Sequence, residues 1–400
     1  MSIRRTAILA WDYPPSASGL AIAAREIAES LAGAGVEVTL FCLDRSGTET
    51  HGGVRVVGCL PEKSGVAGFL RRRMALGHLV GPSWLGRRLA AHHVKAPFDC
   101  VEATNWYAPG ALATQIVRLP FVTRHSTPAA TSGALSGKGL RNRLDGRFAC
   151  GLEARTAKGS DGHIFNTAPH EAKVRALYGL SDAAPSAVVG LSLPPARLEA
   201  AARAPYPPAG EAVEILFVGR PEHRKGFDCL MEASEILARE TASGALPRFT
   251  LRLAGIEAGD LSERSDGVRA VMEPLGRLDD AALDAAYGRA HLVAAPSRYE
   301  SFGLVYQEAL AFGRPVAGLG LDPSARGFVG DAGAGLLAKA DSGPALAEVL
   351  RPMIADGDLR LSLRDKALRA AGRFTRASLA AGTLDLYAAA IDRHGASRRK

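Results

Sequence analysis

The 400-residue sequence contains few cysteines and no long apolar run. Its five cysteines are scattered, odd in number and never spaced as C-x-x-C; they are Cys42, Cys59, Cys100, Cys150 and Cys229. This pattern predicts reduced thiols in a cytoplasmic protein and argues against a disulfide framework or a zinc knuckle. No run is long enough to span a bilayer, and the first apolar run is only a strand long before Asp12 and Pro14 interrupt it. We therefore expect neither a transmembrane helix nor a signal peptide.

Two signatures of cofactor or metal binding are incomplete or misplaced. Gly318-x-Gly320 lacks the third glycine and the acidic residue of a dinucleotide fingerprint, so an oxidoreductase is not supported. Asp356-Gly357-Asp358 resembles a metal-binding D-x-D motif, but it lies between two late helices, where helix capping explains both aspartates. We expect no bound metal and no cofactor.

The composition fits a soluble globular protein, and the length predicts two domains. The net charge of +8 is unevenly distributed: the first 190 residues hold 22 Lys and Arg against 14 Asp and Glu, and the remainder holds 27 of each. Such asymmetry is compatible with nucleic acid or an anionic membrane as a partner. No nucleic-acid module accompanies it, so we expect no nucleic acid.

Part of the charge excess lies in residues 63–95, where arginines mix with large apolar residues. These residues are Arg71, Arg72, Arg73, Arg87 and Arg88, with Phe69, Leu70, Leu79, Trp84 and Leu85. One interpretation is an amphipathic surface that rests on anionic lipid, which would make the protein peripheral at the inner face of a membrane. The other is two ordinary helices with a solvated basic face, because Gly77, Gly81 and Pro82 interrupt any helical stripe.

The most informative stretch runs from Ala294 to Val316. It predicts a short buried strand over 291–295, a polar loop over 296–301, and a helix with Ser301 as N-cap and Phe302 and Gly303 in its first turn. The free N–H groups and positive dipole end of such a helix suit phosphate. Glu300 and Glu308 bracket this site, and because carboxylates repel phosphate, sugar or ribose hydroxyls are their better partners.

Three other strand ends carry polar or glycine-rich residues. The strand over 214–219 is followed by Gly219-Arg220 and then Lys225-Gly226, so two fixed cations beside a helix start would form an anion clamp. The strand over 6–11 precedes a loop containing Ser18-Gly19, and the strand over 120–125 ends at His125. In open α/β sheets, ligands bind at the carboxyl ends of strands.

These motifs are similar to the E-x7-E and G-R…K-G patterns of retaining GT-B glycosyltransferases of family 4, the glycosyl transferases group 1. The resemblance extends from about Ala7 to about Tyr387. It implies two Rossmann-like parallel-sheet domains that face each other across a cleft: residues 1–193 hold the acceptor and residues 213–376 hold a nucleotide sugar. Residues 194–212, rich in Pro and Ala, would be the linker, and the last helix, about 377–393, would pack back on the first domain.

The resemblance also implies roles for individual residues. Arg220, Lys225 and the backbone near Ser301, Phe302, Gly303 and Leu304 would hold the donor phosphates, with Gly19 and Gly219 allowing close approach. Glu300 would hold the transferred sugar, Glu308 the ribose, and His125 the sugar from the opposite domain. His125, Arg220, Lys225 and Glu300 would form the catalytic set.

The activity implied is transfer of a sugar from a UDP- or GDP-sugar to an acceptor hydroxyl, with retention of configuration and without metal. The acceptor would be a sugar, a lipid-linked sugar or a small molecule, in glycan, glycolipid or metabolite biosynthesis. Two alternatives stay open. A nucleotide-sugar 2-epimerase would share the clamp but need no acceptor, and a catalytically dead regulator would share only the fold.

Overall fold

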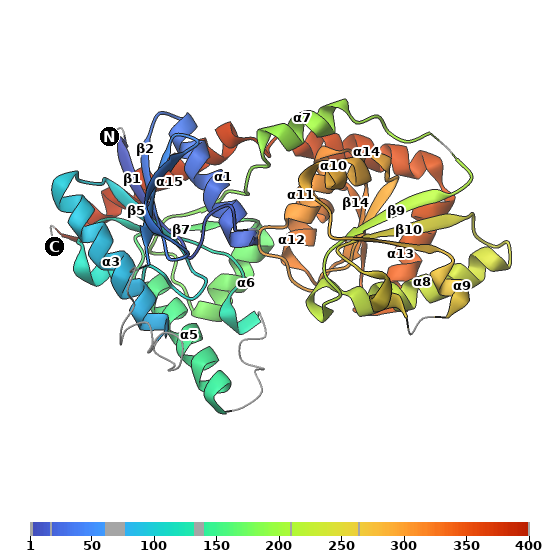
Figure 1. Ribbon diagram of the computed structural model, residues 1–400, viewed down its shortest axis with the longest axis horizontal. Coiled ribbons are helices and arrows are strands. Elements are labelled where there is room, and N and C mark those ends of the chain that lie inside the picture. The colour runs from blue at the N-terminus through green and yellow to red at the C-terminus, as the bar shows by residue number, and fades with distance from the viewer. Residues whose placement is uncertain are drawn as a thin grey trace. The chain divides into compact units, whose positions relative to one another are not determined.

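The computed structural model describes residues 3–16, 18–60, 77–131, 140–208, 210–262 and 265–398. The chain divides into two compact units, Met1–Ser192 with Thr375–Lys400, and Leu193–Phe374 (Figure 1). The expected linker over 194–212 is not a separate segment, because the second unit begins at Leu193 and Pro195–Arg203 folds as a helix within it.

The first unit is built on one sheet whose described strands are β1 Arg5–Leu9, β2 Glu37–Cys42, β3 Ser46–His51, β4 Val54–Cys59, β5 Cys100–Thr104, β6 Phe121–Arg124, β7 Gly162–Phe165 and β8 Ser186–Val188. Its order is β3-β4-β2-β1-β5-β6-β7-β8, and every pair is parallel except the β3–β4 hairpin. The central strands are apolar on both faces because helices cover both sides of a parallel sheet. The hairpin and β8 were not predicted from the sequence.

The described helices of the first unit connect and cover these strands. They are α1 Gly19–Gly33, α3 Gly77–Lys95, α4 Ala113–Ile116, the 3-10 turn η1 Ala129–Thr131, α5 Leu140–Lys158, α6 Ala168–Tyr178 and α15 Arg376–Ser397. Ser18 caps α1, where its hydroxyl accepts from the N–H of Ala21 at 2.9 Å.

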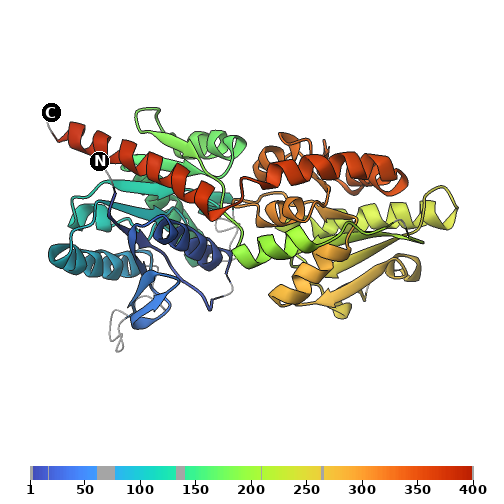
Figure 2. The ribbon, with the colours of Figure 1, turned by 90° about the horizontal axis from the view of Figure 1, so that it is seen from above.

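The last helix, α15, belongs to the first unit and lies against α1 and β7 (Figure 2). A part-buried ion pair attaches it: Arg376 donates to both carboxylate oxygens of Glu26 at 2.8 and 3.0 Å. Further along, Tyr387 donates to Glu102 at 2.8 Å. The C-terminal helix α15 is therefore part of the first unit, although it follows the second unit in the sequence.

The second unit contains a fully parallel sheet in the order β11-β10-β9-β12-β13-β14. Its strands are β9 Val213–Val218, β10 Phe249–Ala254, β11 Met272–Gly276, β12 Leu292–Ala295, β13 Val316–Leu319 and β14 Gly335–Ala338. Its helices and turns are α7 Pro195–Arg203, η3 His223–Lys225, α8 Phe227–Ala242, η4 Ala258–Leu261, α9 Asp266–Arg269, α10 Asp280–Arg289, α11 Leu304–Ala311, α12 Pro323–Ala325, η5 Arg326–Gly330, α13 Gly343–Ala355 and α14 Gly357–Ala371.

Two strands of the second unit follow short helical turns. Residues 326–330 form the π-helical turn η5, which continues directly from α12, buries Phe328 and precedes β14. The short helix α9 precedes β11, which begins at Met272. Asp356 caps α14 by accepting from the Leu359 N–H at 3.0 Å, as the capping interpretation of the D-x-D motif predicted.

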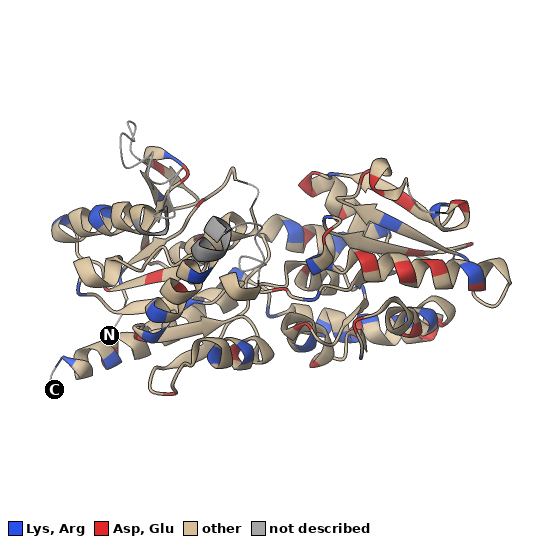
Figure 3. Ribbon diagram, turned by 90° about the horizontal axis from the view of Figure 1, so that it is seen from below, with Lys and Arg blue, Asp and Glu red and all other residues tan. Residues whose placement is uncertain are grey.

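In the second unit, buried apolar residues form two large clusters, one between the sheet and helices α8 and α13 and the other beside α10 and α11. Some charged side chains are buried as well, among them Glu26, Glu102 and Arg124 in the first unit. In the second unit, Lys and Arg are interspersed with Asp and Glu along the ribbon (Figure 3). Within the described residues, no helix is both long and apolar enough to cross a membrane.

Candidate active site

Each sheet reverses its strand order at one place, and the candidate residues follow the strands there. In the second sheet the reversal lies between β9 and β12, and in the first between β1 and β5. Loops at the carboxyl ends of such strands form the ligand crevice of open α/β sheets. The loops that follow β9 and β12 carry Lys225 and Glu300.

The loop after β9 is held against the loop after β12 at a glycine. Gly226 has a φ of +67°, and a Cβ at this position would lie 1.9 Å from the carbonyl oxygen of Pro296. No other residue fits, because the conformation and the contact both require glycine. Gly226 therefore brings its neighbour Lys225 beside Glu300.

Lys225 and Glu300 form the centre of the candidate site. Lys225 Nζ lies 2.5 Å from Glu300 Oε1, and Ser297 Oγ donates to the same oxygen at 3.0 Å. Arg224 Nη1 lies 3.4 Å from it. Burial alone would raise the pKa of Glu300, but the two cations outweigh it, so the pKa is lowered and the carboxylate stays charged.

The two predicted clamp residues are not placed alike. The side chain of Arg220 is 73% exposed and pairs with Glu222 at 2.8 Å, whereas Lys225 is 18% exposed and pairs with Glu300. Arg224, which the sequence analysis missed, is the second cation near Glu300. The G-R…K-G spacing gave no signal for it, since an arginine among four charged neighbours looks like surface.

The helix after β12 starts later than predicted. α11 begins at Leu304 with Gly303 as its N-cap, so Ser301 is not the cap, and Phe302 and Gly303 precede the first turn. Gly303 has a left-handed φ of +62°, which a right-handed helix cannot include, and a Cβ there would meet Phe328 at 2.8 Å. Among the described residues, the backbone N–H groups of Phe302, Gly303 and Leu304 have no hydrogen-bond acceptor. These groups are suited to an anion.

A buried carboxyl supports this loop and was not predicted. Asp322 is 0% exposed and accepts hydrogen bonds from the Glu300 N–H at 3.0 Å, the Ser324 N–H at 3.1 Å and the Tyr306 hydroxyl at 2.6 Å. Burial, with the nearby charge of Glu300, raises the pKa of Asp322 to about 7. Asp322 thus fixes the backbone from which Glu300 projects.

Glu308, the second glutamate, is occupied by residues from outside its own helix. Arg197 on α7 pairs with one of its oxygens, and Tyr287 on α10 donates to the other at 2.8 Å. Arg197 also binds Asp284 at 2.7 Å and Asp280 at 2.9 Å. Sequence reasoning missed Arg197 because it lies in the segment interpreted as a linker.

In the first unit, the packing around position 19, after β1, does not require a glycine. Gly19 opens α1, and a Cβ at this position would meet nothing within 4 Å. Its neighbour Ser18 caps the helix and donates to Asp12 at 2.6 Å. Gly19 therefore leaves open space beside a capped helix start, whereas Gly219 lies close to Phe217 and Lys225.

His125 directly follows β6, as the sequence predicted, but its side chain is 0% exposed. Its ring stacks on Phe165 with centroids 4.5 Å apart, and Nε2 lies 3.2 Å from His163 Nδ1. Burial lowers the pKa of His125 well below its usual range, so the ring is neutral. A direct contact with a sugar, which remains a prediction, would require its neighbours to move.

The basic segment is described only in part. Arg71, Arg72, Arg73, Phe69 and Leu70 lie outside the described residues, as does the Leu79 side chain. On α3, Arg87 and Arg88 are exposed, but Leu85 is fully buried and Trp84 packs against the same core. Leu85 therefore belongs to the core and cannot add apolar lipid contact, whereas Trp84 is partly buried against that core.

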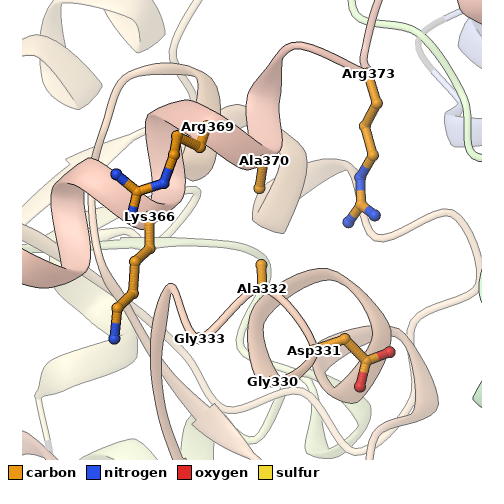
Figure 4. A pocket seen from close by; sticks show the side chains of 8 residues that line it. All are labelled: Gly330, Asp331, Ala332, Gly333, Lys366, Arg369, Ala370 and Arg373. Atoms are coloured by element: carbon orange, nitrogen blue, oxygen red, sulfur yellow. The ribbon is translucent and has the colours of Figure 1, made fainter.

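A basic cavity of about 670 Å³ lies in the second unit away from these loops (Figure 4). Lys366 and Arg369 of α14 line one end and Arg373 lines the other, facing the loop Gly330–Gly333. This loop precedes β14, so it belongs to the opposite edge of the parallel sheet from Lys225 and Glu300. No cluster of three potential metal ligands occurs in the part of the chain that the structure describes.

Two family models match the chain. Residues 199–370 match the model described as "Glycosyl transferases group 1", and residues 18–192 match the "Glycosyl transferase 4-like domain". The match in the second unit includes all the loops described above around Lys225 and Glu300.

Curated relatives match over most of the chain. A D-inositol 3-phosphate glycosyltransferase from Kineococcus radiotolerans is 28% identical, covering 99% of this chain and 98% of the relative. One from Catenulispora acidiphila and the glycogen synthase of Mycobacterium tuberculosis are each 30% identical, covering 78% of this chain and 77% of the relative.

Solved structures share the fold. The sucrose-phosphate synthase of Thermosynechococcus elongatus superimposes with a TM-score of 0.66 at 20% identity, covering 99% of this chain and 98% of that one. The trehalose 6-phosphate synthase of Burkholderia multivorans gives a TM-score of 0.69 at 16% identity, with coverage of 99% and 100%.

Proposed function

This chain belongs to the glycosyl transferases group 1, the GT-B glycosyltransferases of family 4, and on that premise we propose that it transfers a sugar from a UDP- or GDP-sugar to an acceptor hydroxyl with retention of configuration. The second unit would hold the donor and the first the acceptor. Inositol phosphate, which the names of several relatives contain, is the first acceptor to test.

The observation that carries this proposal is the grouping of cations and free amides beside Glu300. Lys225 and Arg224 lie at Glu300, and the N–H groups of Phe302, Gly303 and Leu304 lack acceptors among the described residues. A diphosphate needs such fixed donors, and a sugar or ribose hydroxyl can donate to the carboxylates of Glu300 and Glu308. Free amide donors and carboxylate acceptors both occur between residues 300 and 308.

These groups would act on the leaving phosphate. When the bond between the anomeric carbon and the phosphate oxygen breaks, negative charge grows on that oxygen while the sugar gains oxocarbenium character. Preorganised donors stabilise this charge more in the transition state than in the ground state. Lys225 is already held by Glu300 at 2.5 Å, so little reorganisation is needed to present its ammonium group.

In our proposal, the anomeric configuration is retained because the acceptor attacks the same face of the sugar from which the phosphate departs. The acceptor oxygen bonds to the anomeric carbon as the phosphate departs, and the acceptor's proton passes to the departing phosphate oxygen. Glu300 is not needed as a nucleophile in this reaction. Its lowered pKa and its ion pair with Lys225 keep it charged, which suits it to accept hydrogen bonds from hydroxyls. We propose that the reaction needs no metal, since Lys225, Arg224 and the amides supply the positive charge.

The test is product analysis with UDP- and GDP-sugars and a panel of acceptors including D-inositol 3-phosphate. We expect acceptor-dependent release of nucleotide, a product with the donor's anomeric configuration by proton NMR, and full activity in excess EDTA. An acceptor-independent change in the nucleotide sugar would favour the epimerase alternative. Inverted product, or loss of activity in EDTA that Mg²⁺ or Mn²⁺ restores, would contradict the proposed mechanism.

A further inference from the structure

The carboxyl end of β5, at the strand-order reversal of the first sheet, carries a strained aromatic loop. Tyr107 and Ala108 both have left-handed backbone conformations, with φ of 50° and 42°. Two consecutive residues other than glycine rarely adopt this conformation, because each costs free energy that the surrounding structure must offset. Such strain concentrates at ligand sites.

A buried acid holds the strained loop in place. Glu153 on α5 is 0% exposed, and its oxygens accept from the Tyr107 N–H at 2.8 Å and the Ala129 N–H at 3.0 Å. Tyr178 donates to the same carboxyl at 2.6 Å. None of these three hydrogen-bond donors is a cation, and burial raises the pKa of Glu153 to about 7. Burying a carboxyl without a counter-ion costs free energy. We therefore assign Glu153 the role of holding the backbone of this loop.

The loop presents aromatic rings rather than charge. Trp106 and Tyr107 are half-buried and form an edge-to-face pair with centroids 4.8 Å apart. From the adjacent loop after β1, Trp11 Nε1 donates to the Trp106 carbonyl at 2.6 Å. The two loops on either side of the reversal are thus tied together, and both carry a tryptophan.

We infer that Trp106 and Tyr107 form the platform on which the acceptor docks, and that the acceptor is a sugar or cyclitol ring bound through an apolar C–H face. This inference rests on the proposed function and specifies its acceptor site. A hydroxylated ring has alternating C–H and O–H groups, so one face can lie on an aromatic ring while the hydroxyls stay hydrogen-bonded. Glu153 is a positioning residue for the platform.

The sequence offers a direct test because its three tryptophans, Trp11, Trp84 and Trp106, all belong to the first unit. In the wild type, titration with the acceptor that supports turnover should change the tryptophan emission, and Trp106→Phe should lose that change. Equal changes in the wild type and in Trp106→Phe, or no change in the wild type at saturating acceptor, would overturn the inference.

Kinetics give the second arm. Trp106→Ala should raise the acceptor KM at least tenfold and leave the affinity for UDP or GDP unchanged, whereas Trp84→Phe, at a site packed against the core, should change neither. Glu153→Gln should raise the acceptor KM without altering nucleotide affinity. A wild-type acceptor KM in Trp106→Ala would refute the platform. An enzyme that uses no acceptor would instead refute the proposed function.

Discussion

The two sheets share a topology at their strand-order reversals but present opposite chemistry there. In the second unit, the loops after β9 and β12 bring Lys225 and Arg224 to Glu300, and Arg197 pairs with Glu308. In the first unit, the loops after β1 and β5 carry tryptophans, and the hydrogen-bond partners of the buried acid Glu153 are two backbone N–H groups and a tyrosine hydroxyl. Ion pairs surround both glutamates in the second unit, whereas in the first unit the Arg45–Asp44 pair holds only the backbone of the loop after β1.

This difference indicates which kind of ligand each edge suits. Cations that are already held by carboxylates can be presented to a diphosphate without paying the entropy of ordering them. An edge with aromatic rings and neutral histidines suits an uncharged ring surface, since stacking needs no counter-ion. The comparison therefore predicts that substitutions in one unit affect donor binding and those in the other affect acceptor binding.

The largest effect is expected from the cations of the second unit. Lys225→Ala and Arg220→Ala should each lower turnover at least ~100-fold, the scale of removing one preorganised transition-state donor. Arg220 would have to leave Glu222 to act, because it pairs with that residue in the structure. Steady-state kinetics with Lys366→Ala, an exposed lysine in the remote cavity, as control would check this. Near-normal turnover of Lys225→Ala would contradict the assignment of donor chemistry to the cations of the second unit.

A smaller effect is expected from the support of Glu308. Arg197→Ala leaves three carboxylates without their shared cation, so it should weaken nucleotide binding by about tenfold, or ~1.4 kcal/mol, and lower the melting temperature. Calorimetric titration measures the affinity. Arg203→Ala on the same helix, 80% exposed, is the matched control. Equal affinities in the two variants would mean that Arg197 is only structural.

The buried acids provide a test through pH. Asp322 and Glu153 each have a pKa raised to about 7 by burial, so between about pH 4 and about pH 7 the folded state binds protons that the unfolded state has released. Stability should therefore fall as pH rises through this window, by at most ~1.4 kcal/mol per pH unit for each group, and level off above it.

Asp322→Asn and Glu153→Gln should each make that fall shallower, as measured by urea unfolding at a series of pH values. Glu300 provides the contrast, because its pKa is lowered. Its contribution is present above the unfolded pKa and disappears as pH falls through the folded pKa. An unchanged pH profile in both variants would show that the two acids are ionised in the folded protein.

The smallest effect concerns the exposed arginines of α3. We expect weak binding to anionic vesicles at low salt, on the order of 1 kcal/mol for each basic residue near the surface. Because Leu85 is fully buried and Trp84 is partly buried against the same core, the apolar contribution of α3 should be small and binding should weaken steeply with ionic strength. Co-sedimentation of the wild type and of Arg87→Ala with Arg88→Ala measures it. Binding that persists at high salt would show an apolar contribution elsewhere.

The sequence predicted the fold more completely than it predicted the site. Apolar strands alternating with helices gave the parallel sheets, and the positions of Lys225, Glu300 and His125 at strand ends followed from that alternation. The start of α11 was predicted too early, because the left-handed conformation of Gly303, which excludes it from the helix, becomes visible only in the folded backbone.

Partners from distant segments could not be predicted. Arg197 reaches Glu308 from 111 residues away, and Tyr107 reaches Glu153 from 46 residues away. Local patterns of hydrophobicity contain no information on such pairs, and a Pro- and Ala-rich stretch reads as linker even when it folds as a helix. The strain at Tyr107 and Ala108 likewise becomes visible only in the folded backbone.

The central claim is that the second unit binds the nucleotide and the first binds the acceptor ring. Calorimetric titration of UDP and GDP against the wild type, Lys225→Ala and Trp106→Ala tests it most directly. We predict that at least one nucleotide binds the wild type and Trp106→Ala with equal affinity and binds Lys225→Ala much more weakly. Unchanged affinity in Lys225→Ala together with lost affinity in Trp106→Ala would contradict the claim.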